Sequence, residues 1–291
     1  MRRNKTTLFF AAAAAALLTL TFAAAVHSFP RSGGESLAMA REGTVRETVF
    51  VRGLFIYDET VVTTAENGTF TAEAADGDLV AAGERCGALR RLSDLFSDPV
   101  KEIAAPCSGL FFRRTDGWEA ILTRERVASL DPAAVFRLYA PAEGEPASFL
   151  RAGDDCFKLI DPKKDVFFLA EIGAMDVARG DTADLVIGGE DLRGGIEAVY
   201  GAEGRRFALI RLTPSEVCYA SRAAEAGWVL QRRRGTVIDA AAVTERRGEI
   251  GVYCEKKGKR TFCPVSVLCS DGKNCVVLGI NPGEFVFFSK S

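Results

Sequence analysis

The chain has 291 residues, of which 48% are hydrophobic and 26% charged, and its net charge is -2. This length allows one to three domains. A net charge so close to zero, without basic residues interleaved with aromatic ones, argues against a nucleic-acid partner. The only histidine is His27, so the residues after it hold no Ser-His-Asp or Cys-His catalytic arrangement. No catalytic residues are assigned, and the chain is not expected to be an enzyme.

The N-terminal segment, residues 1–28, has the pattern of a membrane anchor. Arg2, Arg3 and Lys5 precede an uncharged run at 6–26, which as a helix would be roughly 30 Å long and match the hydrocarbon core of a bilayer. Basic residues before the run predict a cytoplasmic N-terminus, a single pass through the cell membrane and an extracytoplasmic bulk. The alternative is a cleaved signal peptide and secretion, with Ala23 and Ala25 before the cut.

A linker rich in proline, glycine and serine is expected at 29–43. The stretch at 62–89 follows, and parts of it recur. Residues 62–70 align with 103–111, 41 positions later, and residues 82–86 align with 152–156, 70 positions later. Such internal similarity predicts one module of two related halves, since a few strands alone cannot bury an apolar face.

The turns of these two halves are the predicted structural sites. They comprise Gly68, Gly77, Gly83, Pro106, Gly109, Gly117 and Gly153. Gly68 and Gly109 are expected to adopt positive φ in tight turns, as are Gly77, Gly83 and Gly153. Between the halves, the insert 88–102 predicts a short helix with Leu89, Leu92, Leu95 and Phe96 on one face, which Asp98-Pro99 ends.

Beyond the second half, the pattern remains rich in strands. Residues 118–122 are strand-like, and Asp131-Pro132 predicts the start of a helix that runs to about Tyr139. Short strands with glycine turns at 165–235 predict a small antiparallel barrel, with a helical turn or loop at 221–226. Two hairpins are expected at 236–291, with 261–269 as one strand in which Pro264 marks an edge or a bulge.

The eight cysteines leave two interpretations open. Cys254 with Cys263, and Cys269 with Cys275, could form disulfides across hairpins in an exported chain. Alternatively, the cysteines fill apolar strand positions as free thiols. Their spacing is not that of a zinc site, and no metal is expected.

Several segments resemble the half-motifs of a known family. Residues 105–109 (APCSG) and 77–83 (GDLVAAG) are similar to the two turn motifs of biotinyl- and lipoyl-type halves, and residues 158–160 (KLI) resemble the closing strand. Their return after an insert resembles the barrel-sandwich hybrid of HlyD-type membrane-fusion proteins, the periplasmic adaptors of efflux and secretion systems. Residues 57–60 (YDET) and 116–119 (DGWE) resemble the short-hairpin adaptors of Gram-positive-type anaerobes.

The resemblance continues downstream and implies a mainly β fold. Residues 176–181 and 195–199 are similar to the adaptor β-barrel signature, and residues 235–238, 250–253, 264–265 and 283–286 resemble the membrane-proximal domain. The implied domains are a lipoyl-like barrel-sandwich hybrid at 44–164 with the insert 88–102, a β-barrel at 165–235 and a membrane-proximal β domain at 236–291.

The implied function is that of a membrane-anchored extracytoplasmic adaptor for an efflux or secretion transporter. Its implied partners are an inner-membrane permease of the ABC or RND type and further copies of the chain. No cofactor is expected, because the hairpin tip at 76–78 lacks the lysine that would carry lipoyl or biotin. The insert at 88–102 is also too short for the coiled coil that reaches an outer-membrane channel. The alternative is a cell-envelope scaffold linked to wall synthesis or division.

Overall fold

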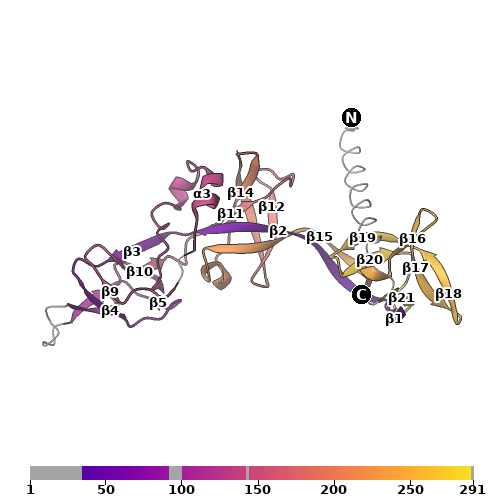
Figure 1. The fold of residues 1–291 in the computed structure, drawn as a ribbon, viewed down its shortest axis with the longest axis horizontal. Coiled ribbons are helices and arrows are strands. Elements are labelled where there is room, and N and C mark those ends of the chain that lie inside the picture. The colour runs from indigo at the N-terminus through magenta and orange to yellow at the C-terminus, as the bar shows by residue number, and fades with distance from the viewer. Residues whose placement is uncertain (1–34, 92–99, 142–143, 290–291) are drawn as a thin grey trace. The chain divides into compact units, whose positions relative to one another are not determined.

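The computed structural model describes residues 35–91, 100–141 and 144–289 (Figure 1). The fold is mainly β, with 56% strand and 7% helix. It divides into a terminal unit, Met1–Thr48 with Leu230–Ser291, and a central unit, Val49–Val229. Two strands, β2 (Arg41–Ile56) and β15 (Ala223–Asp239), each belong in part to both units. No helix in the described ranges is long and apolar enough to span a bilayer, and the predicted anchor at 6–26 lies outside them.

Two four-stranded sheets of the central unit contain the predicted halves. The first half supplies β3 (Glu59–Thr63), β4 (Gly68–Ala72), β5 (Leu79–Val80) and β6 (Arg85–Arg91). The second supplies β7 (Lys101–Ala104), β8 (Gly109–Phe112), β9 (Phe149–Leu150) and β10 (Asp155–Ile160). The sheet orders are β3-β10-β8-β5 and β7-β6-β4-β9, so each sheet takes strands from both halves. The sheets share one core, which includes Phe70, Leu89, Phe111, Phe157 and Leu159.

The backbone hydrogen bonds of the two halves repeat at the offsets found in the sequence. The Gly83 amide donates to the Ala105 carbonyl at 2.8 Å, and the Gly153 amide donates to the Thr64 carbonyl at 2.7 Å. The cross-strand pairs also repeat: Phe70 lies opposite Leu89, and Phe111 lies opposite Leu159. The register shifts at the same place, between Arg85 and Gly87 in β6 and between Asp155 and Phe157 in β10. The predicted internal repeat is therefore confirmed by strand pairing.

Six further strands of the central unit close on themselves. They run in the order β12 (Thr182–Ile187), β13 (Glu190–Ala202), β14 (Arg205–Leu212), β11 (Val166–Glu171), β2 and β15, and β15 pairs back to β12. Closure leaves no free sheet edge, as expected for a small antiparallel barrel. Inward side chains fill it, among them Phe55, Phe168 and Trp228.

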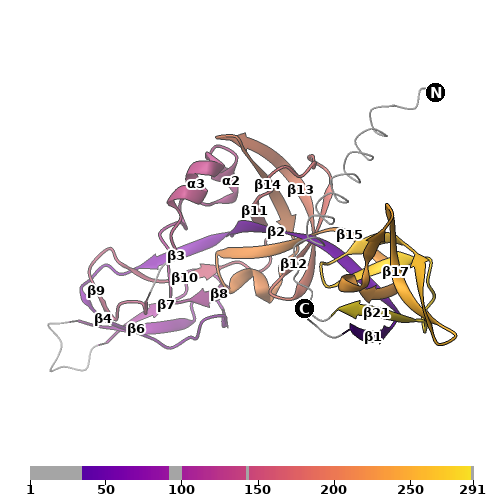
Figure 2. The ribbon, with the colours of Figure 1, turned by 45° about the vertical axis from the view of Figure 1, so that its right-hand side comes forward.

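A helical segment covers part of the outside of this barrel (Figure 2). Its helices, α2 (Arg124–Val127) and α3 (Pro132–Leu138), follow β8, and their apolar residues pack with Phe167 and Leu169 of β11. The strand β11 is therefore buried on both faces. The helix α3 begins as predicted, because the Asp131 side chain accepts a hydrogen bond from the Ala133 amide. The predicted strand at 118–122 is wrong: the Leu122 amide donates to the Trp118 carbonyl, which closes a turn.

The terminal unit is built from both ends of the described chain. One sheet has the order β1 (Glu35–Met39), β21 (Phe285–Ser289), β17 (Glu249–Lys256) and β16 (Thr244–Arg246), and β18 (Lys259–Pro264) also pairs with β17. Figure 2 shows β1 beside β21. The hairpin β19 (Ser266–Ser270) and β20 (Asn274–Leu278) pairs with the end of β15. Two short 3-10 turns, at Glu216–Tyr219 in the central unit and Ala240–Ala242 here, complete the elements.

Four sequence predictions need correction. The linker expected at 29–43 is strand from residue 35, because β1 pairs with β21. The short helix expected within the insert 88–102 is wrong at its start, because β6 extends to Arg91 with Leu89 in the core. The rest of the predicted helix lies at 92–99, outside the described ranges. Residues 261–269 form two strands in different sheets, interrupted after Pro264. The loop expected at 221–226 is strand from Ala223.

The predicted turn glycines separate into two kinds. Gly77, Gly83, Gly117 and Gly153 have positive φ, as expected for turns. Gly68 and Gly109 do not; they begin β4 and β8, and a Cβ there would lie 2.5 Å and 2.9 Å from the carbonyl oxygens of Arg90 and Ile160. Close backbone contact, not positive φ, requires glycine at these two equivalent positions. Pro106 lies in the bend before β8.

Candidate functional site

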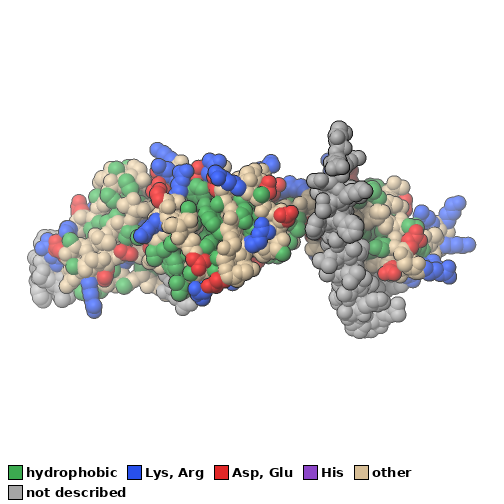
Figure 3. All heavy atoms as spheres, turned by 90° about the horizontal axis from the view of Figure 1, so that it is seen from above, with side chains coloured by type: hydrophobic (Ala, Val, Ile, Leu, Met, Phe, Trp, Pro, Cys, Tyr) green, Lys and Arg blue, Asp and Glu red, His purple; other side chains and the backbone are tan. Residues whose placement is uncertain are grey.

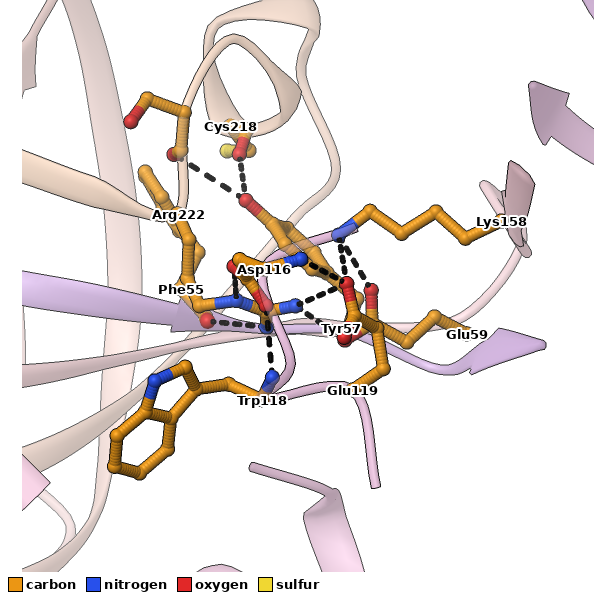
Figure 4. Close-up of polar contacts among 10 residues, drawn as sticks. Phe55, Tyr57, Glu59, Asp116, Trp118, Glu119, Lys158, Cys218 and Arg222 are labelled. Carbon is orange, nitrogen blue, oxygen red and sulfur yellow. Dashed lines mark hydrogen bonds and ion pairs between the residues drawn. The ribbon is translucent and has the colours of Figure 1, made fainter. Parts of the chain in front are cut away.

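Five charged side chains gather in the interior of the central unit (Figure 4). We call them the charge cluster: Glu59, Asp116, Glu119, Lys158 and Arg222. Glu59 begins β3 in the first half, and Lys158 belongs to β10 in the second. Asp116 and Glu119 come from the segment after β8, and Arg222 directly precedes β15 of the barrel. Charged side chains are rarely buried unless they are paired, so this cluster is the main candidate site.

Arg222 is the centre of the cluster. Its Nη2 donates to Glu59 Oε1 at 2.5 Å, and its Nε donates to Asp116 Oδ2. The backbone also holds it, because the Phe55 amide donates to the Arg222 carbonyl at 2.7 Å. The guanidinium lies 5.1 Å from the centre of the Tyr57 ring, within the range of a cation–π contact. The side chain is only 2% exposed, so these contacts are not screened by water.

Lys158 makes the second set of contacts. Its Nζ donates to Glu119 Oε1 at 3.1 Å and lies 3.1 Å from Glu59 Oε2. The latter is an ion pair without hydrogen-bond geometry, since Glu59 Oε2 accepts no hydrogen bond from the described residues. The Asp116 amide donates to Glu119 Oε1 at 2.7 Å, which fixes the two carboxylates of this loop relative to each other.

The cluster holds three carboxylates and two cations, and burial and the cations shift the pKa values of Glu59 and Asp116 in opposite directions. Burial raises the pKa of Glu59, and the charges of Arg222 and Lys158 only partly oppose this effect. Burial would also raise the pKa of Asp116, but its hydrogen bond to Arg222 and the charges of Arg222 and Lys158 outweigh burial and lower it. Burial would lower the pKa of Arg222, but its contacts with Glu59 and Asp116 outweigh burial and raise it. Of these two carboxylates, Glu59 therefore takes up a proton more easily than Asp116.

Tyr57 anchors the cluster to the barrel interior. Its hydroxyl donates to the Cys218 carbonyl at 2.7 Å, and its ring stacks 6.2 Å from that of Phe55. Burial raises the pKa of Tyr57 well above its usual value. Tyr57 therefore stays neutral and acts as a hydrogen-bond donor and a packing group.

The contacts show what this cluster can do. Each carboxylate contacts a cation, and the two cations connect the first half, the second half, the helical segment and the barrel. Pairing of this kind fixes geometry, because breaking one partner would leave a buried charge uncompensated. Across the described ranges, no group of three His, Cys, Asp or Glu side chains is arranged to hold a metal ion. The site is a structural junction.

Most residues of the charge cluster lie in segments that the sequence analysis had singled out, although it assigned no role to their charged side chains. The segment 57–60 supplies Tyr57 and Glu59, and the segment 116–119 supplies Asp116 and Glu119. The structure brings these two segments together. Arg222 was missed, because residues 221–226 were interpreted as a turn or loop. The available signal was a single arginine among mostly small and apolar residues, CYASRAAEAGW, in which Glu225 is the only other charged residue.

The cysteines, and the turns that contain Asp154 and Asp181, do not belong to the charge cluster. All eight cysteines are free, seven of them buried and Cys107 partly so. Cys254 lies opposite Thr261 and Cys263 lies opposite Val252, so the strand register does not place the two cysteines as a directly opposed pair. The carboxylates of Asp154 and Asp181 accept hydrogen bonds from the Arg151 and Ala178 amides, which gives both a local role in turns.

Comparisons with known proteins give structural neighbours alone. No protein-family model and no curated protein matches the chain. ZneB from Cupriavidus metallidurans is 11% identical over 90% of this chain and 95% of that chain, with a TM-score of 0.36. MacA from Actinobacillus actinomycetemcomitans is 12% identical over 87% and 99%, with a TM-score of 0.38.

A third structure, the membrane fusion protein Spr0693 from Streptococcus pneumoniae R6, is 8% identical over 64% of this chain and 100% of that chain, with a TM-score of 0.33. Membrane fusion proteins, the class named for this third structure, are also the class that the sequence motifs resemble. At these identities and TM-scores the likeness carries no argument about function. The proposal below therefore rests on the strands and contacts of this chain.

Proposed function

We propose that the chain is a membrane-anchored extracytoplasmic adaptor that organises an efflux or secretion transporter. In this proposal residues 6–26 cross the cell membrane once, the two-half module is a barrel-sandwich hybrid, and the terminal unit is the membrane-proximal domain. The partner is an inner-membrane permease of the ABC or RND type, and the working form contains several copies of the chain.

One observation supports the proposal above all: the two halves exchange strands. Each four-stranded sheet takes two strands from each half, with equivalent hydrogen bonds at the offsets of 41 and 70 residues. This is the closed pair of half-motifs that the sequence resembles. The charge cluster then fastens the module to the barrel with buried, paired groups. A part that must hold partners in place needs this rigidity and needs no reactive centre.

Two structural details narrow the proposal. The turn at 76–78 is held by the Ala75 amide, which donates to Asp78 Oδ2 at 2.7 Å, and it contains no lysine for a lipoyl or biotin group. The connection between β6 and β7 spans residues 92–100, which as a helix would rise only about 14 Å. A connection this short favours an adaptor that works without an outer-membrane channel.

Photo-crosslinking in native membranes tests the proposal. Leu79 and Phe149 occupy equivalent positions on β5 and β9, and their side chains are 69% and 44% exposed. A photo-reactive amino acid at either site is expected to capture a permease subunit or a second copy of the chain. The matched control is the same amino acid at exposed Arg193 on β13. Capture of wall-synthesis or division proteins in place of a permease would support the envelope scaffold and contradict the adaptor.

A further inference from the structure

The outward face of the terminal-unit sheet carries an aromatic and aliphatic surface. We call it the apolar face: Leu37, Met39, Tyr253, Phe262, Phe285 and Phe287. Cross-strand pairs make it continuous, since Leu37 lies opposite Phe287, Phe287 opposite Tyr253, and Tyr253 opposite Phe262. The alternate residues of the same strands, Val252, Cys254, Cys263 and Val286, form the core. Both faces of this sheet are thus apolar, whereas the outer face of an antiparallel sheet in water is ordinarily polar.

The apolar face is exposed and bounded by cations. Leu37, Met39 and Phe285 are 47%, 57% and 41% exposed. The guanidinium of Arg260 lies 4.1 Å from the centre of the Tyr253 ring, and that of Arg246 lies 5.7 Å from the centre of the Phe262 ring. In Figure 3, Lys and Arg side chains gather where Figure 1 draws β18.

The charge of this region is opposite in sign to that of the chain. Residues 244–261 contain six basic and three acidic residues, a net charge of +3, whereas the whole chain carries -2. Lys256, Lys257 and Lys259 lie at and beside the β17–β18 turn and are exposed. Rings and aliphatic side chains bordered by lysine and arginine form the composition found at a membrane interface. An anionic surface would be attracted to it.

The chain itself limits how far this face can lie from a bilayer. Met39 and Leu37 belong to β1, which begins at Glu35, and the uncharged run ends at Val26. Even fully extended, the connection between these residues spans at most about 32 Å. If residues 6–26 cross the membrane, the start of β1, at the edge of the sheet that carries the apolar face, is tethered within that reach of the lipid headgroups.

We propose that the apolar face, with its bordering cations, binds the anionic phospholipid surface in which the chain is anchored. The rings and aliphatic side chains would enter the headgroup region, and the lysines of the β17–β18 turn would contact lipid phosphates. The inference rests on the proposed membrane location and goes beyond the adaptor role, because it assigns a lipid-binding surface to particular strands. A basic residue near an anionic surface strengthens binding roughly fivefold, so neutralising three lysines should weaken it about a hundredfold.

Fluorescence quenching by brominated lipid tests this with the full chain in nanodiscs. The reporter is Phe285→Trp, and the matched control is Leu278→Trp on β20, where the native side chain is also exposed and lies outside the apolar face. The lipid is acyl-brominated phosphatidylcholine with or without phosphatidylglycerol. We expect added quenching for Phe285→Trp over the unsubstituted chain with phosphatidylglycerol, little without it, and none for Leu278→Trp in either lipid.

A second set of variants decides the role of the cations. Added to Phe285→Trp, the substitutions Lys256→Gln, Lys257→Gln and Lys259→Gln should return quenching to the level of the neutral discs, as should high salt. Equal quenching of the two reporters, or quenching that survives loss of the lysines, overturns the proposal. No quenching in the discs, together with a photo-crosslink from position 285 to a protein in native membranes, would assign the face to a protein partner instead.

The result of the quenching experiment does not depend on the adaptor proposal. The adaptor proposal fails separately, if photo-crosslinking in native membranes captures no permease. A chain that does not insert into discs would overturn the predicted anchor. The same variants would then be mixed with phosphatidylglycerol vesicles, where the same comparison of Phe285→Trp with Leu278→Trp supports or overturns lipid binding.

Discussion

Replacing Arg222 by methionine would test whether the charge cluster holds the central unit together. Methionine keeps the buried volume but removes the hydrogen bonds to Glu59 and Asp116 and the contact with Tyr57. Three buried carboxylates would then face Lys158 alone. Removing one partner from a buried ion pair costs about 3–5 kcal/mol of unfolding free energy, because the remaining charge stays out of water. We expect a loss in that range near neutral pH.

The matched control is Arg137→Met. Arg137 binds Glu203 through both carboxylate oxygens, at 2.9 Å and 3.0 Å, but the two side chains are 57% and 52% exposed. Exposed pairs of this kind contribute at most about 1 kcal/mol. The comparison separates burial from the mere presence of an arginine–carboxylate pair.

The assay is urea unfolding followed by the fluorescence of Trp118 and Trp228, both of which belong to the central unit. The loss in Arg222→Met should shrink as pH falls toward about 5, because unpaired buried carboxylates then take up protons. A loss no larger than that of Arg137→Met, or one that does not change with pH, would refute the assigned role of the cluster.

Three further outcomes are expected. The raised pKa of Glu59 contributes stability that is fully present below its unfolded pKa of about 4.3 and is lost as pH rises through the folded pKa. The lowered pKa of Asp116 contributes stability that is fully present above its unfolded pKa of about 3.9 and is lost as pH falls through the folded pKa. Near neutral pH, Asp116→Asn should therefore cost about 1.5–3 kcal/mol and Glu59→Gln clearly less, and the reverse order in urea titrations would contradict this. Gly68→Ala and Gly109→Ala should each destabilise the module, while Gly201→Ala, in open space on β13, should be neutral or stabilise by up to about 1 kcal/mol in thermal unfolding. Eight thiols should react with a thiol reagent in denaturant without reductant, and few in the native protein, because burial raises the pKa of thiols such as Cys254 and Cys275 to about 12; six or fewer in denaturant would indicate disulfides.

The two-half module could be predicted because its halves repeat local requirements. Gly83 and Gly153 occupy equivalent turns of the two halves, and Phe70 and Phe111 occupy equivalent core positions, so the same residue types recur at fixed offsets. The closeness of Gly68 to the Arg90 carbonyl could not be predicted in the same way. Sequence alone shows that a glycine is needed, but not whether φ or a neighbouring strand requires it.

Sequence patterns could not predict the contacts between residues that lie far apart in the sequence. Arg222 and Glu59 are separated by 163 positions, and the sequence around either residue does not indicate that the other is its partner. The same is true of β1, whose partner β21 lies at the opposite end of the described chain. A strand with its partner so distant looks like a linker when only its neighbours are considered. Pro264 marked a break, but the change of sheet that follows it depends on the packing of both hairpins.

The pairing of β1 with β21 sets an order of events during synthesis. Every strand that lies wholly within the central unit has been synthesised once residue 229 has been made, so this part can collapse early. The sheet that contains β1 must wait for residues 285–289, which are made after every strand of the central unit. Until then the apolar side chains of β1 lack their strand partner, and a chaperone or the bilayer itself would have to shield them. Truncation of even the final strand should therefore leave a product that is prone to aggregate, although its larger unit is intact.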